Sequence, residues 1–245
     1  MRAGDVLRHM AALPVRDLDD IDGGRSALVL APHPDDESLG CGGFIAEACR
    51  RGRPPVVLVL TDGAGSHPTS RSHPAPVLRR VRESEARAAV SELGLPPGRI
   101  GFLGLRDTAA PTAGPAFDAA VAAVLDAHAR GGCGPILAPW EHDPHCDHEA
   151  AHLMAVAAAR RAGVPHLAYP VWGWTLPDDR PLPGLAPDGA RLLIAPHLPA
   201  KRRAIAAHAS QHAGLIRDDP AGFCLPPHLL AVFDRPHETF LRVSP

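Results

Sequence analysis

Short, almost wholly apolar segments alternate with helix-like segments along most of the chain, and this alternation restricts the fold more than any other feature. The first such segment, Ser26–Ala31, reads SALVLA, which is typical of a strand buried on both faces. Later segments of this kind are Pro55–Leu60, Ile100–Leu103, Pro135–Ala138, His166–Val171, Arg191–Ile194 and Thr239–Val243. Helical patterns cover Leu39–Arg51, Val77–Leu93, Ala116–Arg130, Glu149–Arg161 and Pro199–His208. We therefore predict an α/β, Rossmann-like fold whose mostly parallel sheet has helices on both faces.

The size and charge of the chain narrow the function classes. Its 245 residues fit one domain, 1–245, and a hydrophobic fraction of 45% is enough for a sizeable core. The formal net charge of −2 lacks the basic footprint of a nucleic-acid-binding protein. No apolar stretch approaches a membrane span, and charged residues interrupt Met1–Leu13, so no signal peptide is predicted. Five cysteines without a CxxC spacing favour a reducing, cytoplasmic location.

A dense polar cluster directly follows the first predicted strand. His33-Pro34-Asp35-Asp36-Glu37 supplies one imidazole and three carboxylates within five residues. Ligands in open α/β sheets bind at the carboxyl ends of the strands, which is where this cluster falls. Imidazole and carboxylate groups suit zinc or ferrous iron, and Pro34 stiffens the turn that carries them. Glu37 can equally be read as a simple helix-capping carboxylate.

A second cluster follows the strand predicted at Pro135–Ala138. The segment Glu141–Glu149 reads EHDPHCDHE and contains three histidines. One of them can complete a two-histidine, one-carboxylate metal site with room for water. Another could polarise a carbonyl group and protonate a leaving amine, whereas His142 is expected to face solvent.

The same segment permits a competing interpretation. His148-Glu149-Ala150-Ala151-His152 is a literal HExxH, which on a helix places both histidines on one face, as in zinc peptidases. Glu149 would then be the catalytic base. That hypothesis leaves the cluster at His33–Glu37 without a role. A third hypothesis is a carbohydrate- or metal-binding protein without catalysis.

The two clusters resemble the motifs of a known family. Ala31–Glu37 reads APHPDDE and is similar to the signature of the PIG-L/LmbE-type deacetylases, which act on N-acetylglucosamine-like groups. His145-Cys146-Asp147-His148 resembles the second motif of that family, H-x-D-H. Together with several weaker similarities, these motifs span residues 27 to about 211. The weaker similarities comprise Thr61-Asp62-Gly63, Arg82, Glu85, Leu93-Gly94, Asp107, Lys201 and Ser210-Gln211.

The resemblance implies roles for the residues that match. His33, Asp36 and His148 would hold the metal, with Zn²⁺ expected and Fe²⁺ as an alternative. Asp35 would be the general base that activates metal-bound water. His145 would stabilise the oxyanion and help to protonate the amine.

Three further residues receive supporting roles from the resemblance. Asp147 would orient a histidine, and Arg82 and Asp107 would bind the sugar. The implied partner is a small N-acetylated amino sugar or glycoconjugate. The enzyme would remove its acetyl group by hydrolysis. Some relatives carry a tyrosine where this chain has Asp143, so no tyrosine-assisted step is expected.

Other features remain open at this level. The loops at 64–75 and 176–190 are expected to border the site without revealing its specificity. Trp172 and Trp174 could stack on a sugar or pack in the core, and His208 has no assigned role. The oligomeric state is also open, a homo-oligomer included.

Overall fold

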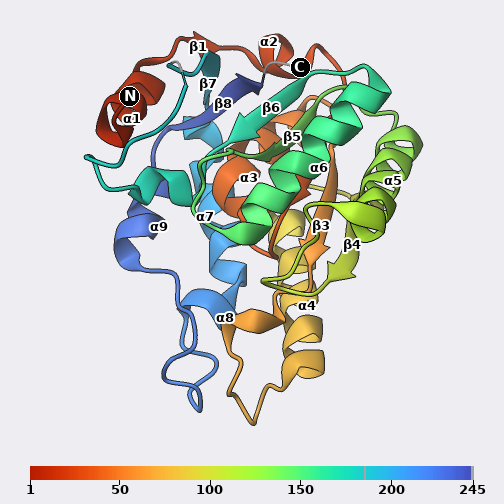
Figure 1. The fold of residues 1–245 in the computed structure, drawn as a ribbon, viewed down its shortest axis with the longest axis vertical. Coiled ribbons are helices and arrows are strands. Elements are labelled where there is room, and N and C mark those ends of the chain that lie inside the picture. The colour runs from red at the N-terminus through yellow and green to blue at the C-terminus, as the bar shows by residue number, and fades with distance from the viewer. Residues whose placement is uncertain (185, 244–245) are drawn as a thin grey trace.

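One mixed sheet forms the centre of the protein, seen in a computed structural model that describes residues 1–184 and 186–243. Within these residues, eight strands lie in the order β1-β7-β8-β6-β5-β2-β3-β4 (Figure 1). Only the two pairs that involve β8 are antiparallel, which confirms the predicted, mostly parallel sheet. The strands are β1 (Val15–Arg16), β2 (Leu28–Ala31), β3 (Val56–Thr61), β4 (Ile100–Leu105), β5 (Ile136–Pro139), β6 (His166–Tyr169), β7 (Gly189–Leu193) and β8 (His237–Val243).

Helices cover both faces of the sheet, as Figure 1 shows for the pairs α5–α6 and α3–α7. They are α1 (Ala3–Ala12), α2 (Leu18–Asp22), α3 (Asp36–Arg50), α4 (Ala75–Glu92), α5 (Gly114–Gly131), α6 (Cys146–Ala162), α7 (Leu198–Ala207), α8 (Ala209–His212) and α9 (Pro227–Phe233). None of the helices in the described part of the chain is long and apolar enough to cross a membrane.

The side chains of β2 explain why its sequence is apolar without interruption. Leu28 and Leu30 pack into the core under α5 and α6, whereas Val29 and Ala31 pack into the core under α3 and α4. Successive side chains of a strand point to opposite faces. Because both faces are covered, all four positions are buried and must be apolar.

Helix α6 begins earlier than the sequence pattern predicted. The expected start was Glu149, but the helix begins at Cys146, and His145 caps it by accepting a hydrogen bond from the Asp147 N–H at Nδ1 (3.1 Å). Histidine is not a common capping residue, so periodicity alone misplaces this boundary. As a result, Asp147 and His148 lie in the first helical turn rather than in a loop.

The direction of chain progression reverses between β2 and β5. The chain runs from β2 to β3 and β4 on one side, and from β5 to β6 on the other. In open α/β sheets, ligands bind at the carboxyl ends of the strands beside such a reversal. Both polar clusters predicted from the sequence follow these two central strands.

Candidate active site

A cavity of 170 Å³ lies at the carboxyl ends of β2 and β5. Most of the predicted site residues line it, namely His33, Asp35, Asp36, Arg82, Asp107 and His145. Two others, Asp147 and His148, are buried directly behind this lining and contact His33 and Asp36 respectively. The fold therefore brings all eight predicted residues together from segments more than 100 positions apart.

The two predicted histidine ligands of the metal both approach a carboxylate oxygen of the third predicted ligand, Asp36. Asp36 Oδ2 lies 3.2 Å from Nδ1 of His33 and 3.3 Å from Nε2 of His148. The Nε2 atom of His148 is buried and has no hydrogen-bond partner among the described residues. A buried nitrogen without a partner is costly unless something else binds it. This unpaired nitrogen beside a carboxylate and a second imidazole fits a metal ion such as zinc or ferrous iron.

Asp143 supports His148 from behind, and sequence analysis gave it no role. Its Oδ2 lies 3.0 Å from His148 Nδ1 and also accepts hydrogen bonds from the N–H groups of Val171 and Trp172. An acceptor-only carboxylate at Nδ1 places the imidazole proton there, which leaves the lone pair of Nε2 facing Asp36. A carboxylate behind a metal-binding histidine is a common arrangement, and this rule was the signal that could have identified Asp143.

Two other carboxylates support His33 in the same way. His33 Nε2 lies 3.1 Å from Asp147 Oδ2 and 3.2 Å from Asp107 Oδ1. Asp147 is itself fixed by the N–H groups of Thr108 and Ala110. The histidine that Asp147 orients is therefore His33, whose Nδ1 is left to face Asp36.

The carboxylates around His33 and His148 stabilise positive charge at this place. Burial by itself lowers the pKa of His33, but the hydrogen bonds that its ring donates to Asp107, Asp147 and Asp36 outweigh burial and raise the pKa well above its usual range. Burial likewise lowers the pKa of His148, yet Asp36 and Asp143 raise it to about 9. Groups that stabilise an imidazolium at this place would also stabilise a bound cation.

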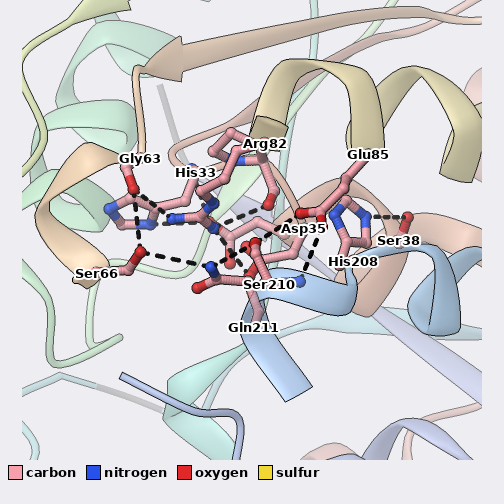
Figure 2. A network of polar contacts seen from close by, with 12 residues as sticks. His33, Asp35, Ser38, Gly63, Ser66, Arg82, Glu85, His208, Ser210 and Gln211 are labelled. Atoms are coloured by element: carbon pink, nitrogen blue, oxygen red, sulfur yellow. Dashed lines mark hydrogen bonds and ion pairs between the residues drawn. The ribbon is translucent and has the colours of Figure 1, made fainter. Parts of the chain in front are cut away.

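Asp35 is buried beside the cluster and is held by Arg82. Burial raises the pKa of Asp35 to about 6, although the nearby Arg82 guanidinium opposes this effect. Arg82 Nη2 donates to Asp35 Oδ2 (3.1 Å) and to Pro34 O (2.9 Å), while Nη1 donates to Gly63 O (Figure 2). A carboxylate with a pKa of about 6 is suited to accept a proton near neutral pH. Arg82 also lines the cavity, but these contacts are to the protein itself, so its predicted role in binding the sugar stays a prediction.

His145 faces the cavity as a half-buried, neutral group. Burial lowers its pKa, and the neighbouring His33 and His148 lower it further. Because Nδ1 accepts the Asp147 N–H, the proton of the neutral ring resides on Nε2. His145 can thus donate a hydrogen bond from Nε2 to a substrate oxygen.

An apolar wall closes the other side of the cavity. It consists of Leu39, Trp172, Phe223 and Leu225. Trp172 packs edge to face against Phe223, with ring centroids 5.6 Å apart. Trp174 instead lines a separate cavity and stacks with Arg235. The contribution of Phe223 and Leu225 was not predicted, because they lie in a segment without a recognisable pattern.

The second histidine of the HExxH motif lies away from this cluster. His152 Nδ1 contacts Pro139 O (3.2 Å), and its ring packs against His166. Two groups of converging metal-ligand atoms occur in residues 1–184 and 186–243, one of His33, His145 and His148 and one of His33, Asp107, His145 and Asp147. Neither group includes His152, and neither includes Asp36. Glu149 is exposed, and His142 lines a different cavity with His152. The geometry does not support a peptidase site.

Comparison with known proteins gives a consistent result. Residues 28–159 match the PIG-L family, described as GlcNAc-PI de-N-acetylase. A diacetylchitobiose deacetylase of Thermococcus kodakarensis is 31% identical over 144 residues, which cover 58% of this chain and 52% of that relative. A 1D-myo-inositol 2-acetamido-2-deoxy-alpha-D-glucopyranoside deacetylase of Rhodococcus opacus is 29% identical over 240 residues, covering 76% of this chain and 82% of the relative.

A solved structure supports the fold. The N,N'-diacetylchitobiose deacetylase from Pyrococcus horikoshii superposes with a TM-score of 0.68 at 22% identity, covering 93% of this chain and 87% of that one. The chain therefore shares its fold with a deacetylase, and its curated relatives are deacetylases of amino-sugar substrates.

Proposed function

Since the chain belongs to the PIG-L family, we propose that it is a metal-dependent hydrolase that removes the acetyl group from an N-acetylated amino sugar or glycoconjugate. One observation carries the proposal. His33 and His148 both approach Asp36 beside the buried Asp35 and the half-buried His145, at the cavity beside the sheet reversal. In this proposal the arrangement supplies ligands for a cation, a base and a hydrogen-bond donor within one small volume.

The metal site in this proposal consists of His33, Asp36 and His148. Zn²⁺ is the first choice and Fe²⁺ the alternative, because two imidazoles and one carboxylate suit both ions. When bound, such an ion lowers the pKa of water and polarises the acetamide carbonyl. The residues Asp143, Asp147 and Asp107 hold the two imidazoles in the orientation that this requires.

Asp35 is the general base in this mechanism. Its carboxylate takes a proton from the attacking water while the oxygen forms a bond to the acetamide carbon. Arg82 keeps the carboxylate in place and stabilises its ionised form against the effect of burial.

His145 stabilises the negative charge that develops on the carbonyl oxygen. Its Nε2–H is the donor, and the ring orientation is fixed by the helix cap at Nδ1. When the C–N bond breaks, the proton held by Asp35 passes to the leaving nitrogen, so the products are acetate and a free amine.

The cavity favours one sugar unit as the bound group. Its volume of 170 Å³ is below the range of about 300–1,000 Å³ of pockets that enclose a drug-sized ligand. We infer that the acetamide and its sugar ring enter, and that the remainder of a larger glycoconjugate stays outside. Trp172 offers an apolar face for the ring, and Asp107 and Arg82 remain the predicted partners of its hydroxyl groups.

Acetate release from a panel of N-acetylated amino sugars tests the proposal. The panel compares protein freed of metal by a chelator with protein reloaded with Zn²⁺ or Fe²⁺. We expect release only after reloading, with one class of sugar preferred. Metal binding without acetate release from any sugar would favour the non-catalytic binding protein instead.

A further inference from the structure

The backbone of Asp35 has a strained conformation. Its φ angle is 156° with ψ at −27°, which is a conformation that residues with a side chain rarely adopt. Such a conformation is energetically costly and persists only where its surroundings enforce it. The contacts that hold Asp35 therefore decide where its carboxylate lies.

Glu37 provides one of these contacts. Its Oε2 accepts the Asp35 N–H at 3.0 Å, and that N–H also lies 3.0 Å from His33 O. The Glu37 side chain is completely buried. A buried carboxylate needs hydrogen-bond donors to compensate for its loss of water. Glu37 is thus more than the capping carboxylate that its sequence position permits.

His208 supplies that compensation from a distant part of the chain. Its Nε2 lies 3.1 Å from Glu37 Oε1, and the Ser38 hydroxyl donates to the same oxygen at 2.7 Å. His208 is 1% exposed and lies between α7 and α8. The chain from Asp35 through Glu37 to His208 is therefore a continuous series of buried contacts.

The residues after His208 fix its position. Ser210 donates to the Glu85 carboxylate from both its N–H and its hydroxyl, at 2.8 and 2.6 Å. Gln211 Nε2 reaches the hydroxyl groups of Ser210 and Ser66. Figure 2 shows the segment His208–Gln211 beside Asp35 and Arg82, with Glu85 on the adjacent helix α4. This segment joins the C-terminal helices to the turn that carries the proposed base.

From these contacts we propose that His208 is a positioning residue of the hydrolytic site. It acts through Glu37 to hold the backbone of Asp35 in its strained conformation. This role rests on the proposed function, since it concerns the base of that reaction. One of its two tests needs no substrate. His208 contacts neither substrate nor metal in this account.

The first test compares His208→Leu with His208→Gln. Leucine removes the donor to Glu37, and a misplaced catalytic group costs up to about 100-fold in rate. We expect kcat of His208→Leu to fall about 10- to 100-fold with little change in KM and with metal content retained. Glutamine carries an N–H at a similar reach, so His208→Gln should recover most of the lost kcat. His212→Gln is the matched control and should behave as wild type, because His212 lies four residues away in α8 and its Nε2 contacts Ala206 O rather than Glu37.

The second test follows hydrogen–deuterium exchange and needs no substrate. In His208→Leu, exchange should accelerate in residues 32–39 and stay unchanged in strand β3. If this variant fails to fold, Glu37→Gln replaces it. An amide has only one acceptor oxygen and cannot accept from both Asp35 and His208, so the same loss of kcat and protection is expected.

Three results would overturn the proposal. They are an unchanged kcat in His208→Leu or Glu37→Gln, an equal loss in the leucine and glutamine variants of His208, and unaltered exchange in residues 32–39. If the wild-type protein releases no acetate from any sugar, the proposed function fails, while the exchange result still decides the role of His208.

Discussion

Replacing Asp143 by Asn should weaken metal binding without removing any of the proposed metal ligands. Asp143 Oδ2 receives the Nδ1–H of His148 and the N–H groups of Val171 and Trp172, and Oδ1 receives the Gly173 N–H at 2.6 Å. An asparagine has one acceptor oxygen. Its NH₂ group must therefore face backbone or imidazole N–H donors on one side, and it cannot accept a hydrogen bond from them. At least one buried N–H is then left without an acceptor. Where the NH₂ group takes the place of Oδ2, the His148 tautomer is also no longer enforced.

The size of the effect follows from both losses. Removing a supporting partner of a metal-binding histidine typically lowers metal affinity about 10- to 100-fold, which corresponds to about 1.4–2.8 kcal/mol. Leaving a buried donor unpaired costs a further 1–3 kcal/mol or so of folding stability. Asp143→Asn should therefore bind zinc more weakly and unfold at a lower temperature.

Competition with a chromophoric chelator measures the zinc Kd, and thermal unfolding measures the stability. Glu149→Gln is the matched control, because Glu149 is exposed on the same helix as His148 and should leave the Kd unchanged. A Kd for Asp143→Asn equal to that of the wild type would refute the proposed role of Asp143.

Three further predictions concern the same site. The value of kcat/KM should fall about tenfold per pH unit below pH 6. The reason is that the pKa of Asp35 is raised to about 6, so the base is protonated below that pH. A pH profile in which kcat/KM does not fall on the acid side would contradict this. His33→Ala should lose bound metal whereas His152→Ala should retain it, as elemental analysis of both variants will show. Trp172→Ala should raise KM for an N-acetylated sugar severalfold with kcat nearly unchanged, as measured by steady-state kinetics. An unchanged KM would exclude an apolar contact between Trp172 and the sugar ring.

The sequence predicted those parts of the fold that depend on local pattern. Strand β2 is buried on both faces, so its apolar run is recognisable without knowledge of the neighbours. The polar clusters that follow β2 and β5 indicated a site because the carboxyl ends of parallel strands share one edge. The short elements β1 and α8 were missed, since two to four residues carry no usable periodicity.

The remaining parts of the site depend on contacts between distant segments. His208 reaches Glu37 across 171 positions, and Asp143 receives its backbone donors from residues 28 to 30 positions away. No periodic pattern encodes such pairs. The start of α6 was also misplaced, because its cap is a histidine, which is not a common capping residue.

Acetate release by Asp35→Asn, at a metal content equal to that of the wild type, tests the central claim most directly. Asparagine preserves the size of the side chain and removes its capacity to accept a proton. General-base catalysis contributes about 10²- to 10⁴-fold, so we predict a loss of kcat of that size on the preferred N-acetylated sugar. A metal-loaded Asp35→Asn protein that releases acetate at the wild-type rate would contradict the assignment of Asp35 as the base and the mechanism built on it.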